Sequence, residues 1–237
     1  MTLPSLRIKL FADGADLPGM IEAARNPAIR GFTTNPTLMR KAGVTDYEAF
    51  ARAAIAAIPD RPISFEVFSD ELEEMEEQAR RIAGWGRDVY VKLPITNTRG
   101  QSIIPLLPRL GAAGVKCNVT AIMTLDQLQA ASAALAGAPP CCLSIFAGRI
   151  ADTGIDPVPV MRRALEIMAP HPHQELIWAS PREVLNLIQA DAVGCHIITM
   201  TSDLLAKLGS LGKNLDRFSL ETVQMFRNDA VAAGYSL

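Results

Sequence analysis

The sequence predicts a single (β/α)8 TIM barrel followed by one extra C-terminal helix. Three observations lead to this fold class: eight short β-rich runs alternate with helical stretches, the chain has 237 residues, and no Gly-x-Gly-x-x-Gly motif follows the first run. Eight βα units in a chain of this length favour a closed barrel over an open sheet. The absence of the glycine motif weakens a dinucleotide-binding fold. We expect residues 1–237 to form one domain, because no linker or low-complexity segment divides them.

The β-rich runs are short and are separated by stretches rich in Ala, Leu, Glu and Arg. They lie at residues 7–13, 31–35, 63–68, 89–94, 115–120, 141–146, 175–180 and 195–200. The clearest helical stretch is 70–84, because its apolar residues recur at helical spacing and charges occupy the other positions. That apolar stripe consists of Leu72, Met75, Ala79 and Ile82.

Three later helices are predicted from their end signals. Residues 124–137 begin with a capping candidate, Thr124, and end at a glycine. Residues 181–191 begin with Pro181, which suits a first helical turn. Residues 219–235 form the predicted C-terminal helix, which begins at an imperfect capping box made by Ser219 and Thr222.

Composition excludes several classes of protein. Lys and Arg number 23 and Asp and Glu 25, so the formal net charge is -2. A basic surface for nucleic acid or for a membrane is therefore not expected. No apolar run reaches the roughly 18 residues of a membrane span. Charged residues interrupt the N-terminal segment MTLPSLRIKLFADGAD before an apolar stretch long enough for a signal peptide can form. We expect a cytoplasmic protein.

The cysteines and histidines argue against disulfides and against a metal site. None of the four cysteines has a metal-ligand spacing, so we expect four small core residues in a reducing compartment. The adjacent Cys141 and Cys142 should point to opposite faces of a strand. The three histidines, at 171, 173 and 196, are too scattered to predict a metalloenzyme.

Polar side chains stand at or near the ends of seven successive β-rich runs, one βα unit apart. They are Asp13, Asn35, Glu66, Lys92, Asn118 with Thr120, Ser144 and Ser180. In an α/β barrel the active site lies at the carboxyl ends of the strands. Strand side chains alternate between faces, and in the third, fourth and fifth runs the polar residues share one face while valine and other apolar residues share the other. We therefore expect the polar face to line the barrel interior and the apolar face to meet the helices.

Lys92 is the sharpest single feature, because a charged lysine is costly to bury inside a strand such as VYVKLP. One interpretation is a structural ion pair with Glu66 or Asp13. The other is a Schiff-base lysine, whose neutral amine attacks a carbonyl carbon. That chemistry requires carboxylates nearby, to move protons during imine formation and during C–C cleavage.

Seven motifs together resemble the transaldolase family. They are FADGAD, GFTTNPTLM, SFEV, YVKLPIT, NVTAIMT, SIFAGRIAD and WASPREV, in the family's order and spacing between about residue 8 and about residue 210. TTNP and VKLP at this separation are specific, whereas either motif alone would be weak. The resemblance implies a barrel and a Schiff-base mechanism without a metal or an organic cofactor.

The resemblance also implies roles for catalytic residues. Lys92 matches the lysine that forms the imine with a ketose, and Asp13 matches the acid–base that deprotonates the substrate hydroxyl beside the scissile bond. Glu66 matches the carboxylate that acts through a water, and Thr120 is similar to the threonine that holds this water. An alternative for Asp13 is a cap on the helix that follows the first strand.

Further residues match the family's substrate contacts. Asn35 and Asn118 match residues that hydrogen-bond the sugar, although each could instead serve only backbone groups at a strand end. Ser144 resembles the serine that contacts the substrate near its first carbon.

Arg149, Ser180 and Arg182 match the family's phosphate-binding residues. An alternative for Arg149 is a salt bridge to Asp152 or Asp156. Pro181 replaces a usual aromatic residue, so the shape of the anion pocket departs from that of the family.

Two positions favour transfer over simple cleavage. The fructose-6-phosphate aldolases of this family tend to carry Gln at the position of Glu66 and Tyr at that of Phe146. Glu66 can shuttle a proton, whereas a glutamine can only orient water. The expected reaction is transfer of a dihydroxyacetone unit from a ketose phosphate to an aldose phosphate. The alternatives are a lyase, an enzyme for a specialised sugar, a non-catalytic barrel, or a phosphate-binding barrel isomerase or epimerase. We expect substrate choice to lie in loops 95–101, 147–156 and 179–183. We also expect a homo-oligomer, and a C-terminal helix whose apolar side packs either on its own barrel or, as the resemblance suggests, on a neighbouring subunit.

Overall fold

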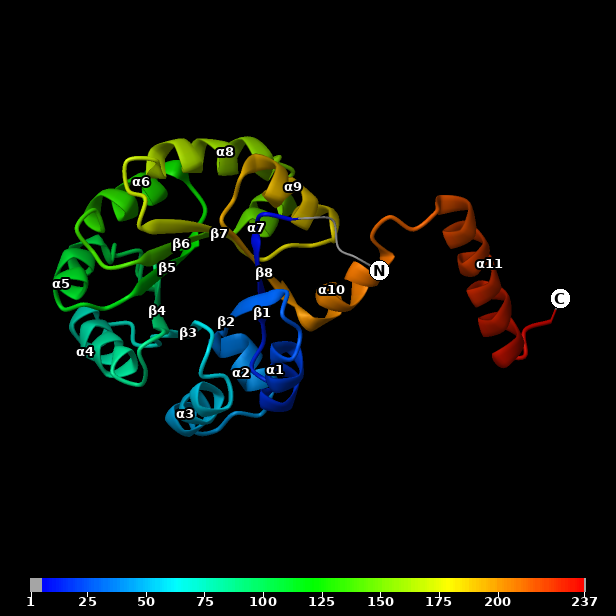
Figure 1. Ribbon diagram of the computed structural model, residues 1–237, viewed down its shortest axis with the longest axis horizontal. Coiled ribbons are helices and arrows are strands. Elements are labelled where there is room, and N and C mark those ends of the chain that lie inside the picture. Colours follow the sequence, from blue (N-terminus) through cyan, green and yellow to red (C-terminus); the bar gives the residue numbers. More distant parts are fainter. Residues whose placement is uncertain (1–5, 237) are drawn as a thin grey trace.

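Eight parallel strands close into a barrel in the order of the chain, and helices cover the outside of the barrel (Figure 1). The structure is a computed structural model, and it describes residues 6–236. The barrel closes because β1 (Lys9–Asp13) pairs in parallel with β8 (Ile197–Thr201) as well as with β2 (Ile29–Thr33). The predicted fold class is therefore confirmed.

The remaining strands follow the same path around the barrel. They are β3 (Ile63–Glu66), β4 (Val89–Pro94), β5 (Cys117–Ile122), β6 (Cys141–Ile145) and β7 (Gln174–Trp178). The helices of the first half are α1 (Leu17–Ala24), α2 (Pro36–Lys41), α3 (Tyr47–Ala57), α4 (Leu72–Ala83), the 3-10 turn η1 (Ile104–Leu106) and α5 (Leu107–Ala112). Those of the second half are α6 (Leu125–Ala134), α7 (Ala147–Asp152), α8 (Pro157–Met168), α9 (Leu185–Val193), α10 (Ser202–Ala206), the 3-10 turn η2 (Lys207–Ser210) and α11 (Leu215–Ala232).

The predicted elements agree with the structure except at two helix starts and two helix ends. α6 ends at Ala134 and α11 at Ala232, each three residues before its predicted end, so the predicted glycine end of α6 was wrong. Every strand begins and ends within two residues of its expected bounds, and the apolar stripe of α4 faces the core. Thr124 caps α6 in a capping box with Gln127, which confirms that start signal.

The prediction for α9 was wrong. Pro181 is not in its first turn, because the backbone N–H groups of Arg182 and Glu183 donate to the side chain of Asn186 and form a turn before the helix.

The prediction for α11 was also wrong at its start. The helix begins four residues before Ser219, because Asn214 caps it by accepting from the backbone N–H of Arg217. Ser219 therefore lies inside the helix, and the hydroxyl of Thr222 donates to the carbonyl of Phe218 instead of completing a capping box.

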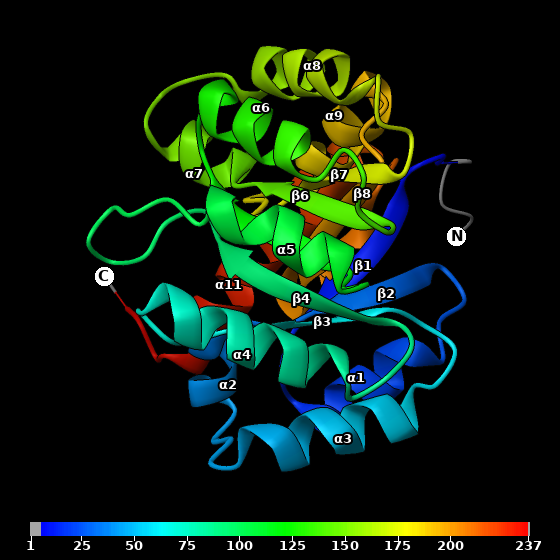
Figure 2. The same ribbon diagram turned by 90° about the vertical axis from the view of Figure 1, so that its left-hand side faces the viewer.

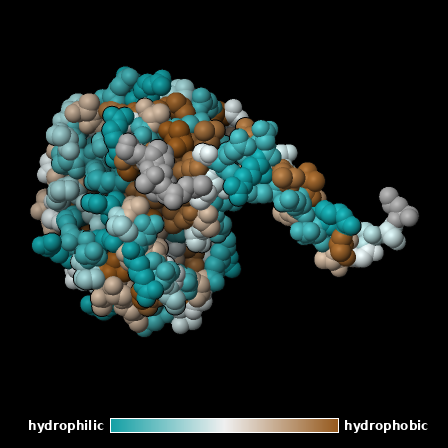
Figure 3. All heavy atoms as spheres, turned by 45° about the vertical axis from the view of Figure 1, so that its right-hand side comes forward, coloured by the Kyte–Doolittle hydropathy of each residue, from teal (hydrophilic) through white to brown (hydrophobic). Residues whose placement is uncertain are grey.

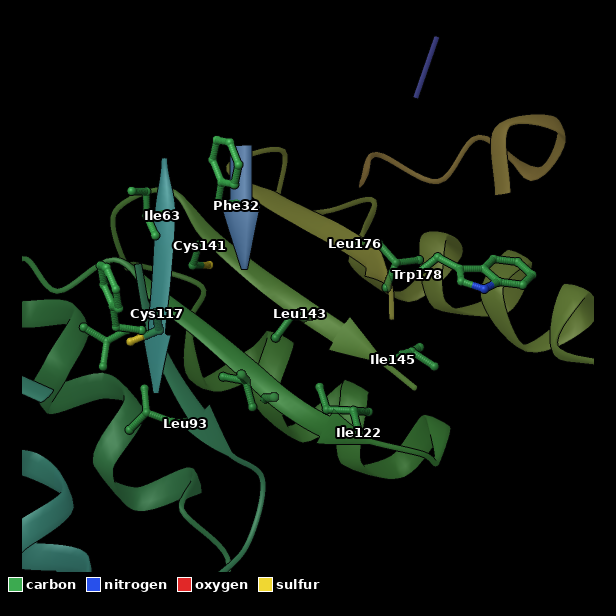
Figure 4. Packing of buried hydrophobic residues seen from close by; sticks show 14 of the residues in the cluster. Phe32, Ile63, Leu93, Cys117, Ile122, Cys141, Leu143, Ile145, Leu176 and Trp178 are labelled. Atoms are coloured by element: carbon green, nitrogen blue, oxygen red, sulfur yellow. The ribbon is translucent and has the colours of Figure 1, made fainter. Parts of the chain in front are cut away.

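The main core lies between the outer faces of the strands and the helices. Figure 4 shows part of it, with Phe32, Ile63, Leu93 and Leu143 on successive parts of the sheet and Trp178 at the end of β7. All five side chains are fully buried. Burial of this apolar face is what orients each strand, so the opposite face must point into the barrel.

A second, smaller apolar cluster fills the barrel interior. Phe11, Cys142, Ile177, Ala179 and Ile197 form it. The ring of Phe11 lies so close to Gly31 that a Cβ there would be 2.5 Å from the ring, so only glycine fits. The predicted split of the cysteine pair is confirmed, because Cys141 belongs to the outer core and Cys142 to this interior cluster. The four cysteines are free and buried, as expected.

The last helix does not pack on the barrel. α11 extends away from it (Figure 1), and none of its residues is buried. Hydrophobic surface is visible along the projecting segment in Figure 3. In α11, Leu215, Phe218 and Phe226 are 78%, 44% and 62% exposed. Within residues 6–236, every helix is too short or too polar to cross a bilayer.

Candidate active site

A polar pocket of about 540 Å³ opens at the carboxyl ends of the strands. Its charged groups are Asp13, Glu66, Lys41, Lys92, Arg149 and Arg182. Its other lining residues are Thr33, Asn35, Pro36, Thr37, Leu38, Thr120, Ala121, Ser144, Phe146, Ala179, Ser180 and Thr199. The side chains come from strands on every side of the barrel, so the closed sheet is what brings them together.

Lys92 lies at the centre of the charged groups. Its side chain is only 8% exposed, and its Nζ donates to the carbonyl of Thr34 at 2.7 Å. Glu66 Oε2 lies 3.0 Å from Nζ, because Glu66 and Lys92 are register partners on β3 and β4. The ion pair that was one of the two interpretations therefore exists, and it lies within the pocket where the other interpretation places the reacting amine.

Tyr47 fixes the backbone of Glu66 from outside the barrel. Its hydroxyl donates to the carbonyl of Glu66 at 2.7 Å and accepts from the N–H of the same residue at 2.8 Å. Burial raises the pKa of this tyrosine above its ordinary value. The phenol therefore acts as a neutral group that holds the end of β3.

Asp13 faces the lysine–glutamate pair from β1. Burial raises the pKa of its carboxyl group, and the positive charge of Lys92 and a 2.7 Å hydrogen bond from the hydroxyl of Thr33 act in the opposite direction. The capping alternative for Asp13 was wrong, because Asp16 caps α1 by accepting from the N–H of Gly19. A carboxyl group with a raised pKa inside a pocket is suited to proton transfer.

Asn118 joins three strands beneath the pocket. Its amide nitrogen donates to the hydroxyl of Ser64 at 3.1 Å, and its amide oxygen accepts from the hydroxyl of Ser144 at 2.7 Å. Asn118 has no solvent exposure and does not line the pocket, unlike the other ten predicted site residues. Its observed contacts orient Ser144, and they are not contacts to strand-end backbone groups.

Asn35 does cap a helix. Its side-chain oxygen accepts from the N–H of Leu38 at 2.9 Å at the start of α2, while the residue also lines the pocket.

Thr120 differs from Asn35 and Asn118 in its hydrogen bonding. Its hydroxyl is buried and has no hydrogen-bond partner within the described part of the chain, and Thr120 also lines the pocket.

Two arginines lie at the outer rim of the pocket, and only one of them forms an ion pair among residues 6–236. Among residues 6–236, no carboxylate lies within ion-pair distance of Arg149, and its guanidinium lies 5.6 Å from the ring centroid of Phe146. Arg182 instead forms a two-pronged pair with Asp152, with Nε 2.9 Å from Oδ1 and Nη2 bound to Oδ2. The expected alternative, a salt bridge from Arg149 to Asp152, was therefore assigned to the wrong arginine.

A close backbone contact holds this rim together. Ser180 has a φ of 54°, in the left-handed region. Its carbonyl oxygen lies against Gly148, where a Cβ would be only 1.6 Å away. Gly148 therefore permits the turn after β7 to lie directly on the start of α7, which keeps Arg149 and Arg182 on the same side of the pocket.

Only two of the three expected specificity loops line the pocket. Loops 147–156 and 179–183 contribute Arg149, Ser180 and Arg182, whereas no residue of 95–101 is part of the lining. The loop after β4 extends beyond the helices (Figure 2). It is fastened there because the Asp70 carboxylate accepts from Thr98, and Arg99 pairs with Asp70 and Glu71.

Sequence reasoning missed several residues of the site. Thr33, Thr199 and Lys41 line the pocket, and Gly148 and Asp152 shape its rim. The face alternation that located Lys92 would also have located Thr199, which follows Ile197 on the inward face of β8. No sequence signal identified Asp152 as the partner of Arg182, because that contact joins residues 30 positions apart on two loops.

The fold and the pocket define a (β/α)8-barrel protein with a charged site at the carboxyl ends of its strands, where such barrels carry their active sites. The model of the family described as Transaldolase/Fructose-6-phosphate aldolase matches residues 10–236. The chain belongs to this family, which confirms the resemblance of its motifs. Within residues 6–236, no three His, Cys, Asp or Glu side chains are grouped so that they could hold a metal ion.

Relatives in sequence agree with the family, and solved structures agree with the fold. A "Probable transaldolase" of Dehalococcoides mccartyi is 32% identical over 85% of this chain and 90% of the relative. A "Probable transaldolase 2" of Listeria monocytogenes is 34% identical over 86% of this chain and 89% of the relative. These names indicate a transaldolase-type aldolase. The solved structure of KGPDC from Streptococcus mutans is similar in fold alone, with a TM-score of 0.54, 14% identity and coverage of 84% of this chain and 89% of that one.

Proposed function

We propose that this protein transfers a dihydroxyacetone unit from a ketose phosphate to an aldose phosphate through a Schiff base at Lys92. The observation that carries the proposal is the position of Lys92 Nζ, 3.0 Å from Glu66 Oε2 in a pocket that Asp13 also lines. One amine and two carboxylates in one pocket match what imine formation and aldol cleavage each require.

The proposed first half forms the imine. The neutral amine of Lys92 attacks the ketone carbon, and the carbinolamine then loses water. Glu66 moves the protons of this step through a water that the free hydroxyl of Thr120 binds. The product is an iminium ion that serves as an electron sink.

The proposed second half breaks and remakes a C–C bond. Asp13 accepts the proton of the substrate hydroxyl beside the scissile bond, an aldehyde leaves, and the electron pair of the broken bond moves to the iminium and gives an enamine. Phe146 has no hydroxyl that could protonate the enamine, so it persists until an acceptor aldehyde enters and the steps run in reverse.

The remaining polar residues hold the sugar. Asn35 and Ser144 bind hydroxyl groups near the ketone, and Asn118 acts by orienting Ser144. Arg149, Ser180 and Arg182 bind the phosphate at the outer rim, where two permanently charged guanidinium groups provide planar donors. All steps use side chains of this chain, so we propose no metal and no organic cofactor.

Trapping tests this proposal directly. The protein is incubated with fructose 6-phosphate, reduced with borohydride and digested, and the modified peptide is located by mass. We expect one adduct, on Lys92. The absence of an adduct with any ketose phosphate, or an adduct elsewhere, would overturn the mechanism.

A second measurement separates transfer from cleavage. Erythrose 4-phosphate is added to fructose 6-phosphate and the enzyme, and the products are followed. Transfer predicts a seven-carbon ketose phosphate and little free dihydroxyacetone. Free dihydroxyacetone as the main product would support the lyase alternative, and no turnover with either sugar would support a specialised substrate.

We further propose that the protein is a cytoplasmic homo-oligomer that binds neither nucleic acid nor membranes. The net charge of -2 and the four free cysteines support the location and the absence of such partners. The exposed apolar residues of α11 support contact with a second copy, because an amphipathic helix gains its stability mainly from packing. Light scattering after size exclusion tests this, and Phe226→Glu should lower the observed mass.

A further inference from the structure

Three side-chain oxygens lie in a row along one wall of the pocket. The hydroxyl of Thr33 on β2 donates to Asp13 Oδ1 at 2.7 Å, and the hydroxyl of Thr199 on β8 lies 2.5 Å from the hydroxyl of Thr33. Both threonines are buried, with 2% and 6% of their surface exposed. The row connects the two strands that flank β1, and it ends on the carboxyl group of β1.

The barrel register explains why these groups meet. Asp13 is the neighbour of Thr33 across β1 and β2, and Phe11 is the neighbour of Thr199 across β1 and β8. The Phe11 ring extends toward Gly31 and belongs to the apolar interior cluster. Thr199 therefore lies between the apolar interior cluster and the polar pocket, and its hydroxyl contacts the hydroxyl of Thr33.

We propose that Thr199 is a positioning residue that acts through Thr33 to stabilise Asp13 in both of its protonation states during the reaction. The inference rests on the proposed function, in which Asp13 takes up a proton in cleavage and returns it in the addition step. The two hydroxyl groups can each donate one hydrogen bond and accept others, so the row can reverse its direction without moving a heavy atom.

The two directions correspond to the two states of the carboxyl group. When Asp13 is ionised, Thr199 donates to Thr33 and Thr33 donates to the carboxylate. When Asp13 carries the substrate proton, its own O–H donates to Thr33, and Thr33 donates to Thr199, whose hydroxyl then turns to the pocket that it lines. Only hydroxyl rotations are involved, and no proton moves between residues.

The charged groups around Asp13 set the direction of the expected pH effect. Lys92 and Glu66 face Asp13 across the pocket, Lys41 of α2 shares the lining, and Asp16 and Asp203 lie on the outer side near α1 and α10. None of these groups changes in a Thr199 variant. A hydrogen bond to an ionised group is stronger than one to a neutral group, so loss of the Thr199 hydroxyl destabilises the ionised form of Asp13 more.

The test uses Thr199→Val, which removes the hydroxyl and keeps the shape, and Thr199→Ser, which keeps the hydroxyl. Single-turnover release of glyceraldehyde 3-phosphate from fructose 6-phosphate is followed across pH. We expect Thr199→Val to slow cleavage by about three- to tenfold and to move the acidic limb of the rate profile to higher pH. Thr199→Ser should remain within about twofold of the unmodified protein. Borohydride trapping at Lys92 should succeed in both variants.

A matched control removes another buried hydroxyl. Ser132 is 2% exposed, and its hydroxyl donates to Gln174 outside the pocket at 2.6 Å. Ser132→Ala should lower the melting temperature without moving the pH profile. If Thr199→Val does not fold, Thr199→Ala removes the same hydroxyl without adding a methyl group and is measured in the same way.

The outcomes separate this inference from the proposed function. An unmodified protein that gives no Lys92 adduct overturns the proposed function itself. An adduct together with an unshifted pH profile in the hydroxyl-free variant overturns the role of Thr199. Equal effects of Thr199→Ser and Thr199→Val would also overturn it, because they would assign the effect to packing.

Discussion

The floor and the rim of the pocket are built from different kinds of structure. On the floor, Lys92 and Glu66 come from strands and form an ion pair, and Asn118 directly beneath them bonds Ser64 and Ser144. On the rim, Arg149 and Arg182 are exposed and come from a short helix and a turn with a left-handed serine. The floor is therefore positioned by strand register, whereas the rim depends on how two loops lie on each other. We infer that the reaction type is fixed by the floor and that substrate choice is set at the rim.

The largest expected effect is on the floor, from Lys92→Met. Without the amine no imine forms, so turnover should fall by at least about a thousandfold and borohydride should trap nothing. Lys116→Met is the control, because Lys116 also pairs with a carboxylate, that of Asp88, but lies directly before β5 at the opposite end of the barrel. If Lys92→Met kept substantial turnover, the reaction would not take place at the floor of the pocket, and the proposed division of roles between floor and rim would be wrong.

Glu66→Gln should have the next largest effect. The amide can still contact Lys92 Nζ, but it cannot accept and release a proton, so we expect a loss of about a hundredfold in the rate of imine formation. Rapid-quench trapping measures that rate. Glu175→Gln is the control, since Glu175 pairs with Lys9 at the other end of the barrel. An unchanged trapping rate in Glu66→Gln would show that Glu66 takes no part in proton transfer and is only a structural partner of Lys92.

The two arginines sharpen the description of the rim. Arg149→Ala should raise KM for fructose 6-phosphate by about tenfold or more, because Arg149 forms no salt bridge within residues 6–236 and is proposed to bind the phosphate. Arg182→Ala should have a smaller effect, since Asp152 already neutralises that guanidinium. Neither change should alter KM for dihydroxyacetone, which has no phosphate. Equal effects on the phosphorylated and unphosphorylated donors would remove both residues from the anion site.

Gly148→Ala tests whether the rim depends on close backbone contact. The new Cβ would overlap the Ser180 carbonyl oxygen, so the turn must move. We expect a loss of about 1–3 kcal/mol in the free energy of unfolding and a few-fold rise in KM for phosphorylated donors. Gly137→Ala is the control, because a Cβ there meets nothing within 4 Å. A variant with an unchanged KM and reduced stability would separate the fold of the rim from its function.

Asp13→Asn should produce the smallest effect on stability, and its sign is informative. The folded state raises the pKa of Asp13 above its unfolded value of about 3.9, so the folded chain binds more protons. Stability is then lost as the pH rises from about 4 through the folded pKa. An asparagine avoids this loss, so it should stabilise the protein more at pH 8 than at pH 4, while abolishing turnover. Thermal melts at several pH values measure the difference, and a stabilisation that does not grow with pH would contradict it.

Prediction from sequence succeeded where the residues of a single strand show a clear alternation of apolar and polar side chains. The alternation of apolar and polar residues in β3, β4 and β5 correctly predicted that Glu66, Lys92 and Thr120 face the pocket. The same alternation placed Cys141 and Cys142 on opposite sides of the sheet. Prediction failed at the start of α9, where the turn that Asn186 stabilises overrides the favourable position of Pro181.

The sequence by itself determined the barrel, the order of its strands and which residues face inward, because these follow from local periodicity and from burial of the apolar face. The tertiary structure decided the pairings. It joined Arg182, not Arg149, to Asp152, placed Asn118 beneath the pocket, and brought Thr33 and Thr199 together beside Asp13. Thr33 and Thr199 are 166 positions apart, and they meet only because the barrel closes where β8 pairs with β1. Local sequence patterns carry no information about contacts over such separations, so the partners of each functional group had to come from the fold.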